Sequence, residues 1–282
     1  MDRNTKINRI RSSLSFKPDK EFEALATAEA VDHLRSRGWV LLPSVLIAGL
    51  RDRLTEAMEL AHVKVRRIQL ANGVGDGTDG TLHHLPIIDE VFLEFLQCRY
   101  CGDILDAFFG GPYLLNTFGG VLNLPNNLSY VGAIHRDQRT FSGDLPLMCQ
   151  LLVMLDDFTE DNGATYFLDG SHLRSEKPDS NLFFAKASRA VGPAGSIIVF
   201  NSNLWHAAGK NFTNGYRRAL TLNFSKPFIK QQLDYPRALG YERARTLTSE
   251  LRQLLGYNAR VPESLEEWYQ PADRRLYQRD QG

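Results

Sequence analysis

Three side chains of this sequence have the types and the order that bind a transition metal. His135 and Asp137 form an H-x-D motif, and on an extended strand two such residues point to the same face and can hold one ion. A second histidine, His206, follows the apolar segment 195–201. Two imidazoles and one carboxylate make up the facial triad of non-haem iron(II) oxygenases, which leaves metal positions open for other ligands. These residues therefore predict iron(II) chemistry.

An arginine with a suitable position follows the second histidine. Arg217 stands eleven positions after His206 and lies at the start of the predicted strand YRRALTLNF. A 2-oxo acid that chelates an iron ion has a distal carboxylate, which needs a fixed cation. The planar fork of an arginine suits this role because it donates two parallel hydrogen bonds to one carboxylate. Arg217 and Arg218 point to opposite faces of a strand, so only one of them can enter a barrel.

Around these residues the sequence resembles the phytanoyl-CoA dioxygenase family of iron- and 2-oxoglutarate-dependent oxygenases. The resemblance rests on the H-x-D motif, on LDDFTEDNGATYFLDGSH (155–172) and on AGSIIVFNSNLWHAAGKNFTNGYRRALTLNF (194–224), and it spans roughly residues 120–226. It departs from the family pattern at Asp169, where a typical member has the proline of a Pro-Gly-Ser-His turn. The resemblance implies a mainly β fold, a double-stranded β-helix (a cupin-like jelly roll) with iron at its open mouth.

The resemblance also implies roles for single residues. His135, Asp137 and His206 correspond to the iron ligands, and the family spacing makes Arg217 rather than Arg218 the clamp on the far carboxylate of 2-oxoglutarate. The implied cofactors are Fe(II), 2-oxoglutarate as cosubstrate, and O2. Further contacts to the cosubstrate are expected from residues on or beside strands that lead to the same mouth: Thr165, Asn123 and Gln150.

Other polar residues near these motifs have both a functional and a structural interpretation. Arg139 and Phe141 alternate with the H-x-D motif and can line the substrate side, with Arg139 meeting an anionic group; an ordinary surface arginine is equally compatible. His172 is interpreted as structural rather than as a ligand. His83 and His84 follow a glycine-rich loop and belong either to a solvated loop or to a lid over the substrate.

The implied reaction is oxidation of a small-molecule metabolite, most simply hydroxylation, with release of succinate and CO2, in the biosynthesis of a specialised metabolite. Related halogenases have a small residue at the position of Asp137, so a carboxylate there argues against halogenation. Epoxidation, desaturation and cyclisation use the same site and stay open. Two other classes are compatible with the residues: a jelly-roll iron isomerase or epimerase without net oxygenation, and a non-catalytic jelly-roll protein that binds a small molecule.

The elements that must position these residues are predicted from the apolar pattern. Between residues 113 and 226, short apolar runs alternate with Gly, Pro, Asn and Asp, which is typical of an antiparallel sandwich or barrel. Helical spacing predicts flanks over residues 27–110 and 240–270. The chain 1–282 is therefore expected to form one domain. The helical segments expected in detail run from Thr27 to Gly38, over 46–66, over 91–109, and around 247–255 and 265–268, with a strand at 39–42.

Two segments of the N-terminal half have further interpretations. The segment NGVGDGTDG (72–80) predicts a mobile loop, because it lacks the Gly-Lys-Ser/Thr ending of a phosphate-binding loop. Cys98 and Cys101 lie within the apolar pattern of the helix expected over 91–109, so they are interpreted as ordinary helix cysteines rather than a zinc or redox pair. The first 20 or so residues are expected to form a polar tail.

The composition restricts the class of partner. Lys plus Arg and Asp plus Glu both number 33 in 282 residues, so no net field favours nucleic acid or an acidic membrane. No segment approaches the roughly 20 apolar residues of a membrane span, and no secretory signal begins the sequence. Three cysteines argue for a reducing compartment, and we expect a cytoplasmic enzyme. We predict a small-molecule substrate and no nucleic-acid or membrane partner; no oligomeric state is predicted.

Overall fold

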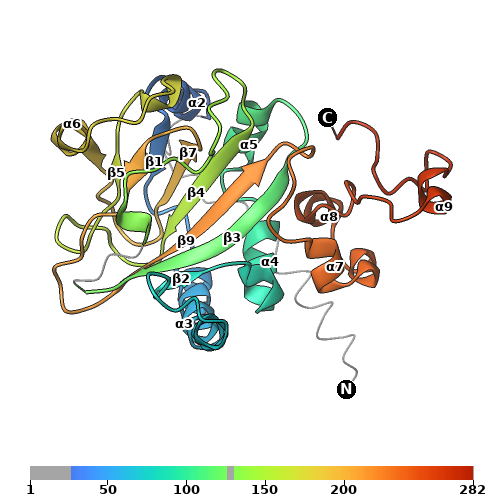
Figure 1. Ribbon diagram of the computed structural model, residues 1–282, viewed down its shortest axis with the longest axis horizontal. Helices are drawn as coiled ribbons and strands as arrows, with labels where there is room; N and C mark the ends of the chain where they lie inside the picture. Colours follow the sequence, from blue (N-terminus) through green and yellow to red (C-terminus); the bar gives the residue numbers. More distant parts are fainter. Residues whose placement is uncertain (1–26, 126–129, 282) are drawn as a thin grey trace.

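The computed structural model describes residues 27–125 and 130–281, and its core consists of two antiparallel sheets that face each other (Figure 1). The larger sheet has the strand order β1-β7-β4-β9-β3-β2, and the smaller has the order β6-β5-β8. The strands are β1 (Trp39–Leu42), β2 (Thr81–Leu82), β3 (Leu114–Asn123), β4 (Met148–Met154), β5 (Tyr166–Phe167), β6 (Ser188–Arg189), β7 (Ile197–Asn201), β8 (His206–Ala207) and β9 (Arg217–Ser225). The predicted β core is confirmed, and the predicted polar tail lies outside the described residues.

The central strands of the larger sheet present two different faces, because side chains alternate along a strand. On β9, Leu220 and Leu222 belong to the main apolar cluster that the helices complete. The alternate residues of β9, among them Arg217, Ala219 and Thr221, line a cavity on the opposite face. The same alternation on β4 and β7 sends a second apolar cluster toward the smaller sheet, where the rings of Phe167 and Phe200 lie 5.1 Å apart. This two-layer arrangement agrees with the predicted jelly roll.

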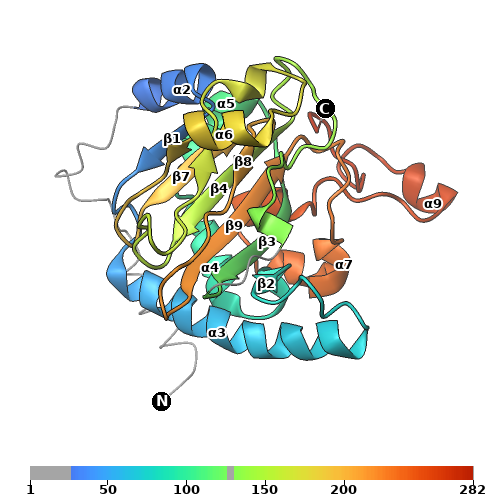
Figure 2. The same cartoon turned by 60° about the vertical axis from the view of Figure 1, so that its left-hand side comes forward.

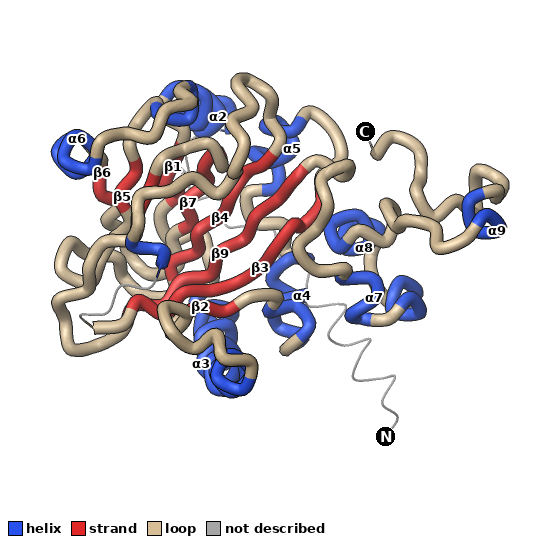
Figure 3. The backbone as a smooth tube through the Cα atoms, in the orientation of Figure 1, coloured by secondary structure: helices blue, strands red, loops and turns tan. Residues whose placement is uncertain are grey.

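Helices cover the apolar face of the larger sheet (Figure 2; Figure 3). Those with buried side chains in the main cluster are α2 (Thr27–Ser36), α3 (Ala48–Ala71), α4 (Glu90–Gln97), α5 (Gly102–Phe109), α7 (Tyr235–Leu239) and α8 (Ser249–Leu255). Two short helices lie elsewhere: α6 (Ser180–Lys186) buries Phe183 beside the smaller sheet, and α9 (Leu265–Trp268) projects from the body in Figure 1. Within the described residues, no helix is both long and apolar enough to cross a membrane.

The prediction of one continuous helix over 91–109 was wrong. The segment is divided into α4 and α5 by a turn at residues 98–101, where Arg99 and Cys101 adopt left-handed backbone conformations (φ 49° and 61°). Tyr100 stacks on Phe95 at 5.4 Å between ring centroids, and Arg99 forms an ion pair with Asp106 at 2.9 Å. The apolar faces of both helices join the same core cluster, which is why one continuous pattern concealed the turn. The two cysteines are free thiols at helix ends rather than inside a helix.

The Asn162-Gly163 turn packs against two other segments, the end of β3 and the segment after β8. Gly163 has a φ of +85°, and a Cβ atom on it would lie 2.3 Å from the Asn123 amide nitrogen and 2.3 Å from the Gly209 carbonyl oxygen. The Asn123 amide donates to that carbonyl at 2.9 Å. The end of β3 and the segment after β8 are therefore joined at a point where only glycine fits.

We expect Gly163→Ala to destabilise the protein by about 3 kcal/mol, because it combines a left-handed backbone with a steric clash. The free energy of unfolding, measured with a chemical denaturant, tests this. Gly73→Ala is the matched control: its φ is +68° and its Cβ would have no atom within 4 Å, so it should cost only about 1 kcal/mol. Equal losses in the two variants would contradict the role of the close approach at Gly163.

Candidate active site

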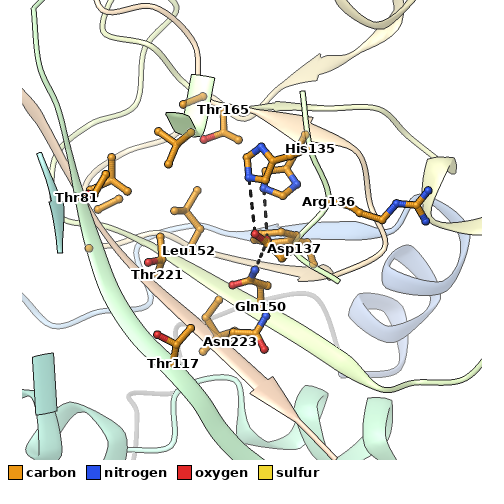
Figure 4. Close-up of a pocket in the computed structure, with 18 of the residues that line it drawn as sticks. Thr81, Thr117, His135, Arg136, Asp137, Gln150, Leu152, Thr165, Thr221 and Asn223 are labelled. Carbon is orange, nitrogen blue, oxygen red and sulfur yellow. Dashed lines mark hydrogen bonds and ion pairs between the residues drawn. The ribbon is translucent and has the colours of Figure 1, made fainter. Parts of the chain in front are cut away.

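The two histidines of the predicted triad are brought together by backbone hydrogen bonds. His135 and His206 form an antiparallel bridge, in which the His135 N–H donates to the His206 carbonyl at 3.0 Å and the His206 N–H donates back at 2.9 Å. Their ring centroids lie 4.2 Å apart. The expectation that the H-x-D motif lies on an extended strand was wrong: His135 makes this single bridge and Asp137 lies in a bend. The bend still turns the carboxylate toward the imidazoles (Figure 4).

The three side chains form a compact set of ligand atoms. One ligand atom each from His135, Asp137 and His206 can be chosen so that all lie within 4.8 Å of one another. The Asp137 carboxylate is 3.7 Å from Nε2 of His135 and 3.5 Å from Nε2 of His206. In both histidines Nδ1 lies near a backbone carbonyl, that of Ala133 at 2.7 Å and that of Leu204 at 3.0 Å. A proton on Nδ1 leaves Nε2 free as a metal ligand, so the donor set fits an iron(II) ion.

Burial keeps one of these imidazoles neutral. Loss of solvent around His206 lowers its pKa to about 4; His135 acts in the same direction and Asp137 opposes it. A neutral imidazole is the form that binds a metal. The amide nitrogen of Gln150 donates to the Asp137 carboxylate and fixes its orientation (Figure 4).

The triad opens into a cavity of about 640 Å³ between the two sheets. Of the predicted cosubstrate residues, Gln150, Thr165 and Arg217 line it, and so does the predicted substrate residue Arg139. Asn123 and Phe141 are not among its lining residues. Instead, the Asn123 amide is bonded to the Gly209 carbonyl, as described above. Phe141 packs against the Arg136 guanidinium at 5.4 Å from its ring centroid.

Arg217 is a buried cation without a carboxylate partner among the described residues. It is 2% exposed, and neither its Nε nor its Nη1 has a hydrogen-bond partner in that part of the chain. Its guanidinium lies 3.9 Å from the ring centroid of Phe158. Burial lowers its pKa to about 9, and Asp156 opposes this shift, so the group is still charged at neutral pH. Arg218 points to the other face of β9 and pairs with Asp156 at 2.6 Å, as strand alternation predicts.

The histidines outside the triad have contacts of their own. His83 lines the cavity, and its Nε2 is 3.4 Å from the Tyr130 hydroxyl. His84 instead lies 3.2 Å from the Tyr235 hydroxyl. His172 is buried, and its Nε2 is 3.0 Å from the Arg35 carbonyl. This contact accords with a structural role.

The predicted turn at Asp169 is held by its side chain rather than by a proline ring. Its carboxylate accepts hydrogen bonds from the Trp39 indole at 2.7 Å and from the Arg37 guanidinium at 3.0 Å. These two donors lie at the junction of α2 and β1. The carboxylate therefore fastens the smaller sheet to the N-terminal flank.

Reasoning from the sequence missed several polar residues of the cavity, among them Thr117, Thr221 and Asn223. The alternation that separates Arg217 from Arg218 continues along β9, and extending it would have found Thr221 and Asn223. Thr117 faces Asn223 across the β3–β9 pairing, a register that the sequence alone does not give.

The fold and the site define a class, and comparison with known proteins gives the same one. The family description "Phytanoyl-CoA dioxygenase (PhyH)" matches residues 34–219. The protein is an iron(II)- and 2-oxoglutarate-dependent dioxygenase that uses O2. More particularly, the chain belongs to the phytanoyl-CoA dioxygenase family, whose members act on small-molecule substrates.

Individual relatives agree with this membership. The uncharacterized protein Rv1501 of Mycobacterium tuberculosis is 34% identical, over 89% of this chain and 94% of that protein. Dioxygenase af480 of Aspergillus fumigatus is 26% identical, over 80% of this chain and 76% of that protein. Two solved structures share the fold. AviO1 from Streptomyces viridochromogenes is similar with 22% identity, a TM-score of 0.54, and coverage of 72% of this chain and 96% of that one. The non-heme alpha ketoglutarate dependent carbocyclase SnoK has 18% identity, a TM-score of 0.55, and coverage of 71% and 84%.

We expect Asp137→Ala to lose iron(II) binding, because two imidazoles alone leave the ion without its anionic ligand. Anaerobic calorimetric titration with iron(II) measures the loss. Asp144→Ala removes an exposed carboxylate from the same loop region and should bind iron like the unchanged protein. Retention of full iron affinity by Asp137→Ala would show that the metal lies elsewhere.

Proposed function

We propose that this dioxygenase hydroxylates a small organic metabolite and converts 2-oxoglutarate to succinate and CO2 in the same cycle. One observation carries the proposal: the His135, Asp137 and His206 side chains face the same cavity as Arg217, a buried cation without a carboxylate partner among the described residues. A buried charge without a counter-ion is costly, so a site that contains one is built for an anionic ligand.

The proposed roles follow from the position of each side chain. His135, Asp137 and His206 would hold the iron, and Arg217 would receive the distal carboxylate of 2-oxoglutarate in a forked hydrogen-bond pair. Thr165, buried directly before β5 of the smaller sheet, would add a hydroxyl donor to the same cosubstrate. When bound, the iron would supply the oxygen-activating chemistry, while the chain orients both substrates and excludes water.

Hydroxylation rather than halogenation is favoured by the third ligand. The Asp137 carboxylate points at the imidazoles and receives a hydrogen bond from Gln150, so it fills the position that a halide would need. Arg139 lies on the exposed side of the cavity, where it can meet an anionic group of the substrate. Phe141 would act there only indirectly, through its packing against Arg136.

The proposed setting is the biosynthesis of a specialised metabolite. SnoK, which shares the fold, comes from nogalamycin biosynthesis, and fungal relatives are named as dioxygenases. The three free cysteines accord with the proposed cytoplasmic location, because a reducing compartment keeps thiols reduced.

The first test is an anaerobic titration of the metal-free protein with iron(II) and 2-oxoglutarate, followed by visible absorption. A weak charge-transfer band that requires both additions is expected, because the cosubstrate must chelate the iron. In turnover assays, His135→Ala and Asp137→Ala should then form no succinate. A folded protein that gives no band would reject the proposed function and favour a jelly-roll isomerase or binding protein. Product formation without succinate would identify the isomerase.

We expect Arg217→Leu to raise the half-saturating concentration of 2-oxoglutarate on the order of 100-fold, because it removes a charged forked pair. The intensity of the charge-transfer band as a function of 2-oxoglutarate measures this. Arg218→Leu is the matched control, since its guanidinium faces Asp156 and Glu59 on the other side of the strand. It should lower stability and leave the half-saturating concentration unchanged. The reverse pattern would assign the clamp to Arg218.

A further inference from the structure

Beside the triad, the cavity has a floor of uncharged polar side chains. Thr117, Asn223 and Gln150 form one cross-strand row over β3, β9 and β4, because Asn223 is directly opposite both of the others. Thr221 lies two residues before Asn223 on the same face of β9. All four line the cavity, and Figure 4 shows them below Asp137 and His135. We call Thr117, Gln150, Thr221 and Asn223 the polar floor.

The hydrogen bond of Gln150 determines which of its amide atoms is free to contact a ligand. Its amide nitrogen donates to the Asp137 carboxylate, which as an ionised ligand can only accept. The amide oxygen is therefore at the other side of the group, turned away from Asp137 (Figure 4). It can only accept a hydrogen bond, so whatever satisfies it must be a donor.

Two other members of the polar floor also have side-chain oxygen atoms without a hydrogen-bond partner among the described residues. Oγ1 of Thr117 and Oδ1 of Asn223 are buried without a partner in the described part of the chain. Asn223 is only 4% exposed, and its amide nitrogen makes a single long contact of 3.4 Å to the Ser202 hydroxyl. Leaving such atoms unsatisfied costs about 1–3 kcal/mol each, so the floor favours a ligand that offers several donors.

Gln150 was predicted to contact the cosubstrate, but 2-oxoglutarate is a poor match for its free amide oxygen and for that of Asn223. The two carboxylates and the oxo group of 2-oxoglutarate only accept hydrogen bonds, whereas Gln150 and Asn223 present acceptors. A substrate with hydroxyl or N–H groups supplies what is missing. An ammonium group is disfavoured, because Arg139 and Arg217 line the same cavity and Asp137, the one carboxylate among its described lining residues, faces the metal position.

We propose that the polar floor is the recognition site for an uncharged substrate that carries at least two neighbouring hydroxyl groups. This inference rests on the proposed function, because it places that substrate beside the iron ligands. Cβ atoms of residues directly opposite on antiparallel strands lie about 4.5–5.5 Å apart. Adjacent hydroxyls of one molecule can therefore reach different members of the floor. Gln150 acts as a positioning residue that joins the ligand Asp137 to the substrate.

The experiment compares three small probes of the same shape on the protein loaded anaerobically with iron(II) and 2-oxoglutarate. They are trans-1,2-cyclohexanediol, its dimethyl ether, which cannot donate, and trans-2-aminocyclohexanol, which carries a positive charge. Dissociation constants come from saturation-transfer NMR and from perturbation of the charge-transfer band. We expect the diol to bind about tenfold more tightly than the ether and more tightly than the amine.

Thr221→Val and Asn223→Leu test the residues themselves. Each should weaken diol binding about tenfold and leave ether binding unchanged, because each removes one acceptor from the floor. The charge-transfer band should persist in both variants, since neither residue is a proposed metal or 2-oxoglutarate contact. Thr55→Val removes a hydroxyl on α3 that bonds to the Arg51 carbonyl, outside the cavity, and is the control that should keep full diol affinity.

Several outcomes would overturn the proposal: no binding of the diol, equal binding of diol and ether, preference for the amine, or unchanged diol affinity in both variants. Failure of the proposed function is distinguishable, because it appears as a missing charge-transfer band in the unchanged protein. In that case the NMR comparison still measures the polar floor directly.

Discussion

The site depends on the backbone bridge between His135 and His206. Two hydrogen bonds of 3.0 and 2.9 Å join residues that are far apart in the sequence. The backbone alone therefore sets the separation of the two imidazoles. The bridge also ties the segment before Asp137 to the edge of the smaller sheet. Because one imidazole is buried in that sheet, the pair lies between a dry interior and an open cavity. Such a boundary suits a metal site that must exclude water and still admit substrates.

The two faces of the larger sheet have different functions: one packs against the helices, and the other lines the cavity. On β9, the leucines that face the helices belong to the main core, and the alternate residues provide the cation and the polar groups of the cavity. Substitutions on one face therefore act mainly on folding, and those on the other act mainly on ligand binding. The arginine pair shows this division most clearly. Arg218 is neutralised by Asp156 and Glu59 on the helical side, whereas Arg217 has no carboxylate partner among the described residues.

Much of this arrangement could be predicted from local patterns. The period of two along a strand predicted that Arg217 and Arg218 face opposite sides, the family spacing selected Arg217, and the family motifs indicated which histidines meet. The failures have physical reasons. The turn between α4 and α5 could not be predicted, because Arg99 and Cys101 adopt left-handed conformations that these residue types rarely adopt. The orientation of Asn123 depends on a carbonyl at Gly209, a partner distant in the sequence. Such contacts appear only when the chain is folded.

The residues beside the proposed metal ligands affect how the iron would bind. Arg136 lies between His135 and Asp137 in the chain, and its guanidinium stands 4.3 Å from the ring of Trp205, the neighbour of His206. Figure 4 shows its guanidinium directed away from His135 and Asp137. The two ligand segments are thus fastened to each other on the outside as well as by the bridge. Because the two segments are already fixed, they lose little conformational freedom when a metal binds. The entropy cost of binding is therefore small, and the affinity for the ion is higher.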